Sequence, residues 1–196
     1  MHRILPMCLD AAVAALALAY PYVLLNRHCF HDPVRSCWYY ILSVYLCAIF
    51  ALVGLPDIRY IRFDPHINLI PFRYFFSDRS SLPNVALFVP LGVFLPILWQ
   101  RFGVWHHTVL FGFCTSLFIE LLQIFTFRAT DINDLITNTL GTLLGWCFGR
   151  IALRAMKAHS PSPRTRDLLL VCGVTVGFMI LVHPILADPI LRLLMG

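Results

Sequence analysis

The sequence predicts an all-α protein, a polytopic membrane helix bundle of about six transmembrane helices. The chain of 196 residues is 59% hydrophobic and 13% charged, whereas a soluble domain carries about 25% charged residues. Its mean hydropathy is +0.77. The apolar residues gather in segments that mostly approach the roughly 20 residues a spanning helix needs. We therefore expect a single membrane domain over residues 1–196.

The expected helices follow the apolar segments in chain order. The first segment is too long for the apolar core of a secretory signal, and no small-residue cleavage site ends it, so we expect a permanent helix. The third is short, and Pro90 and Pro96 interrupt its hydrogen-bond ladder. The six segments are Ile4–Leu25, Trp38–Leu55, Val85–Trp99, Val104–Phe125, Asp134–Leu153 and Leu168–Ala187.

The connections between these segments differ in kind. Residues 56–84, PDIRYIRFDPHINLIPFRYFFSDRSSLPN, are aromatic, amphipathic and rich in proline. They predict an interfacial or re-entrant loop between helices two and three. Residues 156–167 form a polar linker with a basic bias, which we place in the cytoplasm. Residues 56–84 and 126–133 then face outward.

Composition also excludes several classes of function. The net charge is +5, which fits contact between basic loops and anionic lipid. Nucleic-acid binding is excluded, because no basic stripe with interleaved aromatic residues lies outside the apolar segments. The seven cysteines are scattered and show neither a disulfide framework nor metal-ligand spacing. No serine stands in a G-x-S-x-G setting, which argues against nucleophilic catalysis.

The segment IELLQIFTFRATDINDLITN, residues 119–138, places polar residues in apolar surroundings. Small and polar residues share one face of the fourth expected helix, namely Gly112, Ser116, Glu120 and Gln123. The same holds for the fifth, with Asp134, Asn138, Gly141 and Gly145. A carboxylate at a helix centre costs about 2.5–3.5 kcal/mol on insertion scales, so ionisable residues there indicate a functional site. The predicted catalytic or binding site comprises Glu120, Gln123, Arg128, Asp131, Asp134 and Asn138.

Structural interpretations stay open for several of these residues. Glu120 could pair with Arg128. Asp131 or Asp134 could begin the fifth helix, since acids are favourable at a helix N-terminus. The glycines could simply let helices pack closely, most simply the fourth against the fifth.

Three further residues are candidates for ligand binding. Asn84 is either a cap after Pro83 or a member of the site. Asn68 and Arg73, in INLIPFRYFF, could fold over the same cavity, because the loops that carry them share one side of the membrane with residues 126–133. The candidate ligand-binding residues are therefore Asn68, Arg73 and Asn84.

Three stretches carry a family resemblance: INLIPF, NVALFVPLG and SLFIELLQIFTFRATDINDLITNTLGTLLG. In this order and spacing they resemble the VanZ-like family of bacterial membrane proteins, over a core of about residues 38–155. The resemblance implies a multi-pass protein of the bacterial cytoplasmic membrane. It also implies an association with resistance to teicoplanin, a lipid-tailed glycopeptide antibiotic. It implies location and physiology rather than a mechanism.

Three functions are compatible with these residues. The first is to bind or modify an amphiphile at the outer membrane face: a membrane lipid, a lipid-linked envelope precursor or a glycopeptide. Arginines would hold a phosphate or carboxylate, and the acids would transfer protons or hold a divalent cation. No cofactor is required; if a metal binds, its ligands are Glu120, Asp131 and Asp134. The sequence does not choose between binding and catalysis.

The second function is that of a small transporter or flippase, since polar and proline-broken helices are common in transporters. The short chain and the lack of an internal repeat weaken that reading. The third is a non-catalytic membrane scaffold for an envelope partner. Loops too short for an independent binding domain weaken it.

Overall fold

The computed structural model describes residues 4–53, 67–71, 81–125, 130–155 and 165–182. Within these ranges the chain forms six α-helices and one pair of two-residue strands, so the predicted all-α class is confirmed. The chain divides into two compact units, residues 1–61 with 164–196, and residues 62–163. Most of the predicted interfacial loop 56–84, most of the linker 156–167 and the predicted end of the sixth helix lie outside the described residues.

The first unit contains α1 (Ile4–Leu25), a π-helical turn (Asn26–Phe30), α2 (Pro33–Val53), α6 (Thr165–Gly177) and a second π-helical turn (Phe178–Val182). The bounds of α1 are those predicted. Helix α2 begins at Pro33 rather than at Trp38. The reason is a side-chain cap, because the carboxylate of Asp32 accepts the N–H of Arg35 at 3.0 Å and satisfies a donor of the first turn.

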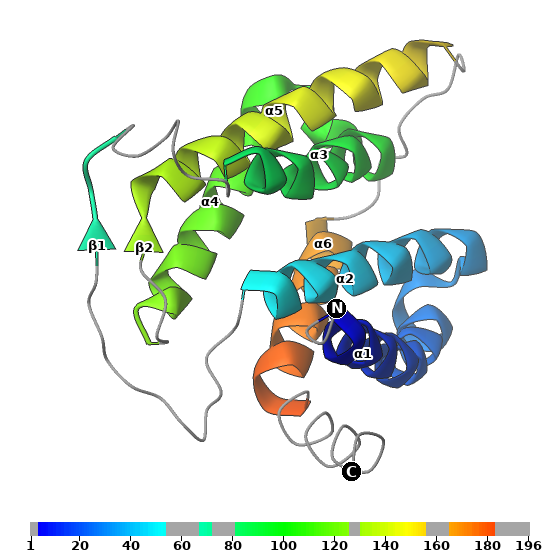
Figure 1. The fold of residues 1–196 in the computed structure, drawn as a ribbon. Helices are drawn as coiled ribbons and strands as arrows, with labels where there is room; N and C mark the ends of the chain where they lie inside the picture. The colour runs from blue at the N-terminus through cyan, green and yellow to red at the C-terminus, as the bar shows by residue number, and fades with distance from the viewer. Residues whose placement is uncertain (1–3, 54–66, 72–80, 126–129, 156–164, 183–196) are drawn as a thin grey trace. The chain divides into compact units, whose positions relative to one another are not determined.

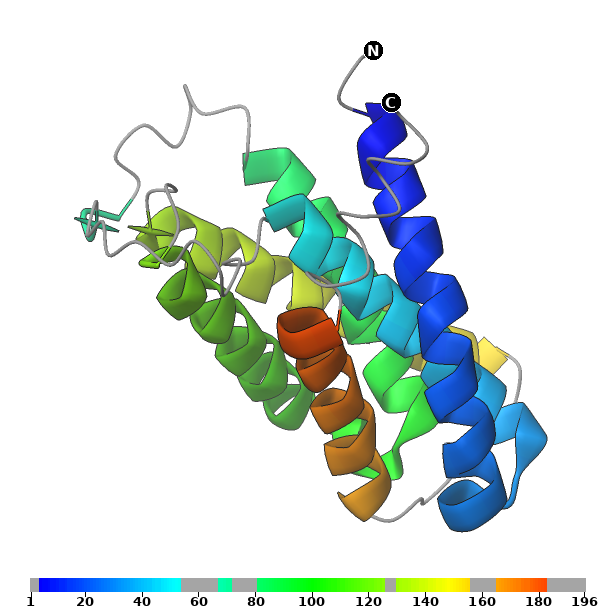
Figure 2. The ribbon, with the colours of Figure 1, turned by 90° about the horizontal axis from the view of Figure 1, so that it is seen from below.

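A sharp reversal between α1 and α2 lays these helices side by side (Figure 2). His31 has a φ of 54°, in the left-handed region, and its N–H donates to the carbonyl of Asn26 at 2.9 Å. Phe30 packs edge-to-face on Tyr39, with ring centroids 5.0 Å apart. The reversal thus ends the π-helical turn and directs the chain into α2.

A buried hydroxyl network joins the three helices of the first unit. The phenol of Tyr22 on α1 is hydrogen-bonded to Ser43 on α2. Thr175 on α6 donates to the same Ser43 oxygen at 2.7 Å. Because a buried hydroxyl is costly without a partner, this network fixes the three helices in register.

The second unit contains the elements that carry the described candidate site residues. Its elements are β1 (Ile67–Asn68), α3 (Ser81–Leu98), a 3₁₀ turn (Gln100–Gly103), α4 (Trp105–Gln123), β2 (Thr130–Asp131) and α5 (Ile132–Ala155). Figure 1 labels α3, α4, α5, β1 and β2. Helix α3 continues through Pro90 and Pro96 as one helix. Strands β1 and β2 pair in parallel, with Ile67 opposite Thr130 and Asn68 opposite Asp131.

Helices α3 and α5 approach each other through glycines. A Cβ added at Gly141 would overlap the carbonyl of Val85, and one at Gly145 would overlap the carbonyl of Val89. Both contacts advance in the same direction, so the two helices run parallel. The predicted close packing of these glycines is confirmed, but the expected partner, the fourth helix, is wrong. Helix α3 is the partner because its own Gly92 removes a side chain opposite Gly145.

One helix of the described part of the chain, Pro33–Leu52, is long and apolar enough to cross a membrane. Residues Leu82–Leu98 form a shorter apolar helix. Helices α4 and α5 bury polar faces, such as that of Thr137, Asn138 and Thr142, which lower their average hydropathy. The expectation of about six spans therefore stays a prediction.

Candidate functional site

Asp131 joins the ends of α4 and α5. It directly precedes the first residue of α5, and its carboxylate accepts the N–H of Asn133 at 2.8 Å, as a helix-capping residue does. Its own N–H donates to the carboxylate of Glu120 at 3.0 Å. The sequence left open whether Asp131 or Asp134 begins this helix; Asp131 does, and it also holds Glu120.

Glu120 lies in the last turn of α4 and is only 4% exposed. This position is unfavourable for an anion, because the C-terminal end of a helix carries partial negative charge. The carboxylates of Asp131 and Asp134 also lie close enough to repel its charge. The hydroxyl of Thr130 donates a hydrogen bond to the backbone carbonyl of Glu120 at 3.1 Å. A buried acid in these surroundings is costly to the fold, so stability alone does not account for it.

Asn68, on strand β1, contacts Asp131 through its side chain. Its side-chain amide donates to both carboxylate oxygens of Asp131, each at 3.1 Å. The backbones of the same two residues are partners in the β1–β2 pair. Asn68 therefore contacts Asp131 from a segment 63 positions away in the chain. Arg73, the other candidate from this loop, lies outside the described residues.

Asn84 supplies the corresponding contact from α3. Because α3 begins at Ser81, Asn84 lies inside its first turn and is not the residue that precedes the helix. Its amide donates to the carboxylate of Asp134 at 2.7 Å. Each aspartate of the site is thus held by an asparagine amide from another element. We call Asn68, Asn84, Glu120, Asp131 and Asp134 the acidic cluster.

A second polar layer lies one helical turn from the acidic cluster. Asn138 on α5 donates its side-chain amide to the hydroxyl of Ser116 on α4 at 2.9 Å. Asn138 is 4% exposed, and its Oδ1 has no hydrogen-bond partner among the described residues. Thr142, one turn further along α5, donates to the backbone carbonyl of Asn138 at 2.9 Å. A buried carbonyl oxygen with capacity to accept a hydrogen bond suits a water molecule or a ligand donor.

The remaining predicted residues have different positions. Gln123 ends α4 and is 5% exposed. Arg128, and with it the expected pairing with Glu120, lies outside the described residues. The described ranges contain no group of three His, Cys, Asp or Glu side chains that could hold a metal ion.

Sequence reasoning missed two contributors. Thr130 lies outside the two polar helix faces that the spacing predicts, yet its hydroxyl donates to the backbone carbonyl of Glu120. The pairing of β1 with β2 was also missed, because a two-residue strand has no alternation that a sequence pattern can detect. Ser116 was placed on the correct helix face, and its spacing of four from Glu120 was the available signal for its role as the partner of Asn138.

Comparison with known proteins gives one family. A family model described as VanZ/LLP1 matches residues 37–153, a range that contains every residue of the acidic cluster. Protein VanZ from Enterococcus faecium is 39% identical over 80 residues, which are 40% of this chain and 49% of that protein. The chain thus spans about half the length of the curated relative it matches. No solved structure matches the chain.

Proposed function

The chain belongs to the VanZ/LLP1 family, and from this premise we propose that it is a multi-pass protein of the bacterial cytoplasmic membrane that binds an amphiphile through the acidic cluster. The observation that carries the proposal is the buried carboxylate of Glu120, 4% exposed, beside Asp131 and Asp134. Three of the chain's ten acidic residues converge there from two helices and a short strand. Such a concentration in an apolar chain indicates function.

The outward surfaces of α4 and α5 support the membrane location. Large apolar side chains on these helices are exposed, among them Leu110 at 60%, Phe148 at 56% and Ile151 at 62%. Exposed apolar surface of this extent is costly in water and favourable against lipid. Several polar side chains in the middle of the same helices are buried, among them Thr108, Ser116, Thr137, Asn138 and Thr142.

The ligand's chemistry follows from the groups that the acidic cluster offers. The described residues present mainly acceptor oxygens, since the amides of Asn68 and Asn84 already donate to the two aspartates. A matching ligand carries donors: sugar hydroxyls, amide N–H groups or an ammonium. Arg128 and Arg73 would add a binding site for a phosphate or carboxylate. A lipid-linked saccharide or a lipid-tailed glycopeptide carries both kinds of group.

Glu120 suits either binding or chemistry. As a carboxylate it would accept a hydrogen bond from the ligand, and as a buried acid it would transfer a proton to or from it. Product analysis after incubation with a labelled glycopeptide separates these roles. An unchanged ligand mass indicates binding alone, and a changed mass that requires Glu120 indicates catalysis.

A role in teicoplanin-type resistance gives the direct test. The chain is expressed in a glycopeptide-sensitive Gram-positive host, and growth inhibition is measured with teicoplanin and with a glycopeptide that lacks a lipid tail. We expect the parent chain to protect against teicoplanin, and Glu120→Gln and Asp134→Asn to abolish protection at unchanged protein level. Asp32→Asn is the matched control, because it removes an acid that pairs locally with Arg35 at 3.4 Å. Full protection by Glu120→Gln would overturn the proposed site.

A small transporter is the second candidate, favoured by the length of the polar face on α4. Thr108, Gly112 and Ser116 are buried and continue the face of Glu120 along most of the helix. Liposomes containing the purified chain and a fluorescent lipid discriminate the two functions. Faster movement of the lipid between leaflets, lost in Ser116→Leu, supports transport; an unchanged rate supports binding without transport.

A further inference from the structure

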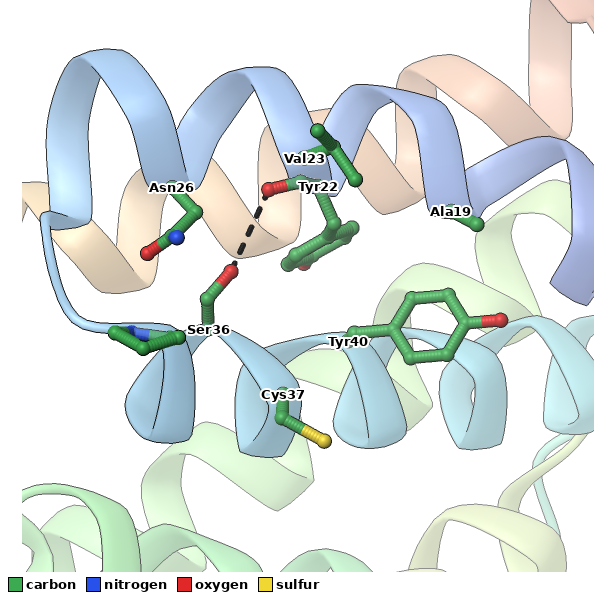
Figure 3. A pocket seen from close by; sticks show the side chains of 8 residues that line it. Ala19, Tyr22, Val23, Asn26, Ser36, Cys37 and Tyr40 are labelled. Atoms are coloured by element: carbon green, nitrogen blue, oxygen red, sulfur yellow. Dashed lines mark hydrogen bonds between the residues drawn. The ribbon is translucent and has the colours of Figure 1, made fainter.

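A groove between α1 and α2 in the first unit has a volume of about 330 Å³. Cavities that bind small molecules have volumes of about 300–1,000 Å³, so this one suits a single hydrocarbon chain. It lies between two neighbouring helices, and Figure 3 shows the side chains that line it. We call it the α1–α2 groove. Its apolar length is lined by Ala19, Tyr22, Val23 and Tyr40.

The two tyrosines present ring carbons rather than hydroxyls to the groove. The phenol of Tyr22 is hydrogen-bonded to Ser43 inside the unit, and that of Tyr40 donates to the carbonyl of Ala15 at 2.8 Å. Their rings pack edge-to-face, with centroids 5.7 Å apart. With both hydroxyls engaged, this part of the groove offers mainly apolar contact.

The opposite end of the groove is polar. Figure 3 places Asn26 and Ser36 at one end and Ala19 at the other. Asn26 accepts the N–H of Asp32 with its Oδ1 at 3.1 Å, and its amide N–H groups have no partner among the described residues. Ser36 is occupied, because it donates to the carbonyl of Tyr22 at 3.4 Å. The groove therefore offers an amide donor at one end of an apolar channel, the polarity of an amphiphile.

Charge near this polar end favours an anion. Residues 26–37 contain Arg27, Arg35 and a single acid, Asp32. Asp32 pairs with Arg35 at 3.4 Å, so Arg27 remains in excess. Trp38, 45% exposed, adds an aromatic side chain of the kind found at membrane interfaces. A segment that carries an excess arginine and an exposed tryptophan is complementary to an anionic lipid head group.

We propose that the α1–α2 groove binds one acyl chain of an anionic phospholipid, whose phosphate lies at the Asn26–Arg27 end. This site is separate from the acidic cluster and does not depend on the ligand proposed there. The ligand of the α1–α2 groove is a phospholipid of the surrounding bilayer.

Native mass spectrometry of the purified full chain in detergent tests the proposal. The chain is equilibrated with dioleoyl phosphatidylglycerol or dioleoyl phosphatidylcholine. We expect one phosphatidylglycerol per chain and weaker retention of phosphatidylcholine. Ala19→Phe should lower occupancy roughly tenfold, which corresponds to displacing about two methylene groups. Leu16→Phe is the matched control, because Leu16 lies on the same helix, is 78% exposed and does not line the groove.

Substitution of the cation tests the head-group assignment. Arg27→Gln should reduce the preference for phosphatidylglycerol over phosphatidylcholine severalfold, whereas Arg154→Gln, an exposed arginine at the end of α5, should not. Equal retention of the two lipids by the parent chain would overturn the anionic assignment. Undiminished retention by Ala19→Phe, or a dimer of the chain in place of bound lipid, would overturn the site.

A labelling experiment on the unsubstituted chain removes any dependence on the folding of variants. Cys37 lines the groove and is exposed, and Cys114 on α4 is equally an exposed free thiol. Maleimide modification of both is followed in one sample by peptide mass spectrometry. Phosphatidylglycerol should slow the modification of Cys37 severalfold and leave that of Cys114 unchanged. Equal rates at Cys37 with and without lipid would overturn the proposal.

Discussion

Helix α5 packs against α3 and α4 by two different means. Against α3 it presents Gly141 and Gly145, whose Cα atoms face backbone carbonyls of Val85 and Val89. Against α4 it presents Asn138, which hydrogen-bonds Ser116. At Gly141 and Gly145 the first interface depends on close backbone contact, and at its start the Asn84 amide of α3 also donates to Asp134 of α5. The second interface combines the Asn138–Ser116 hydrogen bond with a close contact between Gly112 and the side chain of Thr142.

The difference indicates where ligand chemistry is located in this unit. Glycine contacts gain dispersion energy from close approach and leave no side chain that could bind a ligand. The polar interface also holds the two helices together, but it leaves acceptor capacity at Asn138 and a carboxylate at Glu120. The face of α5 at Gly141 and Gly145 is thus structural, whereas Asp134, which contacts α3, and Asn138, which contacts α4, are suited to function.

The largest loss of stability is expected from a substitution at the structural face of α5. Gly145→Ala adds a methyl group where the carbonyl of Val89 and the Cα of Gly92 leave no space. Overpacking of this kind costs about 1–3 kcal/mol or more, so we expect a clear fall in the melting temperature of the purified chain in detergent.

Gly173→Ala on α6 is the matched control, because nothing lies within 4 Å of a Cβ added there. Alanine also favours a helix over glycine by about 0.5–1 kcal/mol, so this variant should melt at the same temperature or higher. If both variants melt alike, the glycines of α5 do not make the close contact described.

A smaller loss is expected at the polar face. Ser116→Ala removes the acceptor of the Asn138 amide, and a buried donor without a partner costs about 1–3 kcal/mol. The matched control is Thr115→Ala, whose half-buried hydroxyl donates only to the Phe111 carbonyl within the same helix at 2.9 Å. Thermal unfolding of the two variants should separate them. Equal stability would show that the Ser116–Asn138 bond does not hold α4 to α5.

The smallest change in stability is expected at Asp131, which lies between the ends of α4 and α5. Asp131→Asn keeps a capping oxygen for α5, so it should cost little, whereas Asp131→Ala should cost about 0.5–2 kcal/mol. Protection against teicoplanin should be lost in both, since both remove a negative charge from the acidic cluster. Retention of protection by Asp131→Asn would assign Asp131 to helix capping alone.

Helix positions were largely predictable, because most apolar runs are long and are separated by stretches that contain charged residues or proline. The bounds of α1 agree with the prediction residue for residue. Helix α2 starts earlier than its apolar run because the side chain of Asp32 caps it. Hydropathy does not report such a cap.

The candidate site was predictable as two polar helix faces, because spacing determines the face on which Glu120 and Asn138 lie. The residues that contact these two helix faces were less predictable. Which helix covers Gly145 depends on Gly92, a residue 53 positions earlier, and spacing along one helix carries no information about a neighbour. Asn68 was a candidate from its loop, but its bond to Asp131 depends on a strand pair that has no periodic pattern.

The parallel pairing of β1 with β2 makes the acidic cluster depend on a contact between residues far apart in the chain. Parallel strands need a long crossover, and here the crossover contains α3 and α4. Closing a loop of 63 residues carries an entropy cost that must be met before the contact stabilises anything. Asn68 can therefore reach Asp131 only after residue 131 has left the ribosome. A chain interrupted before β2 would contain α3 and α4 but no acidic cluster, so the cluster forms only in a unit whose synthesis has passed that point.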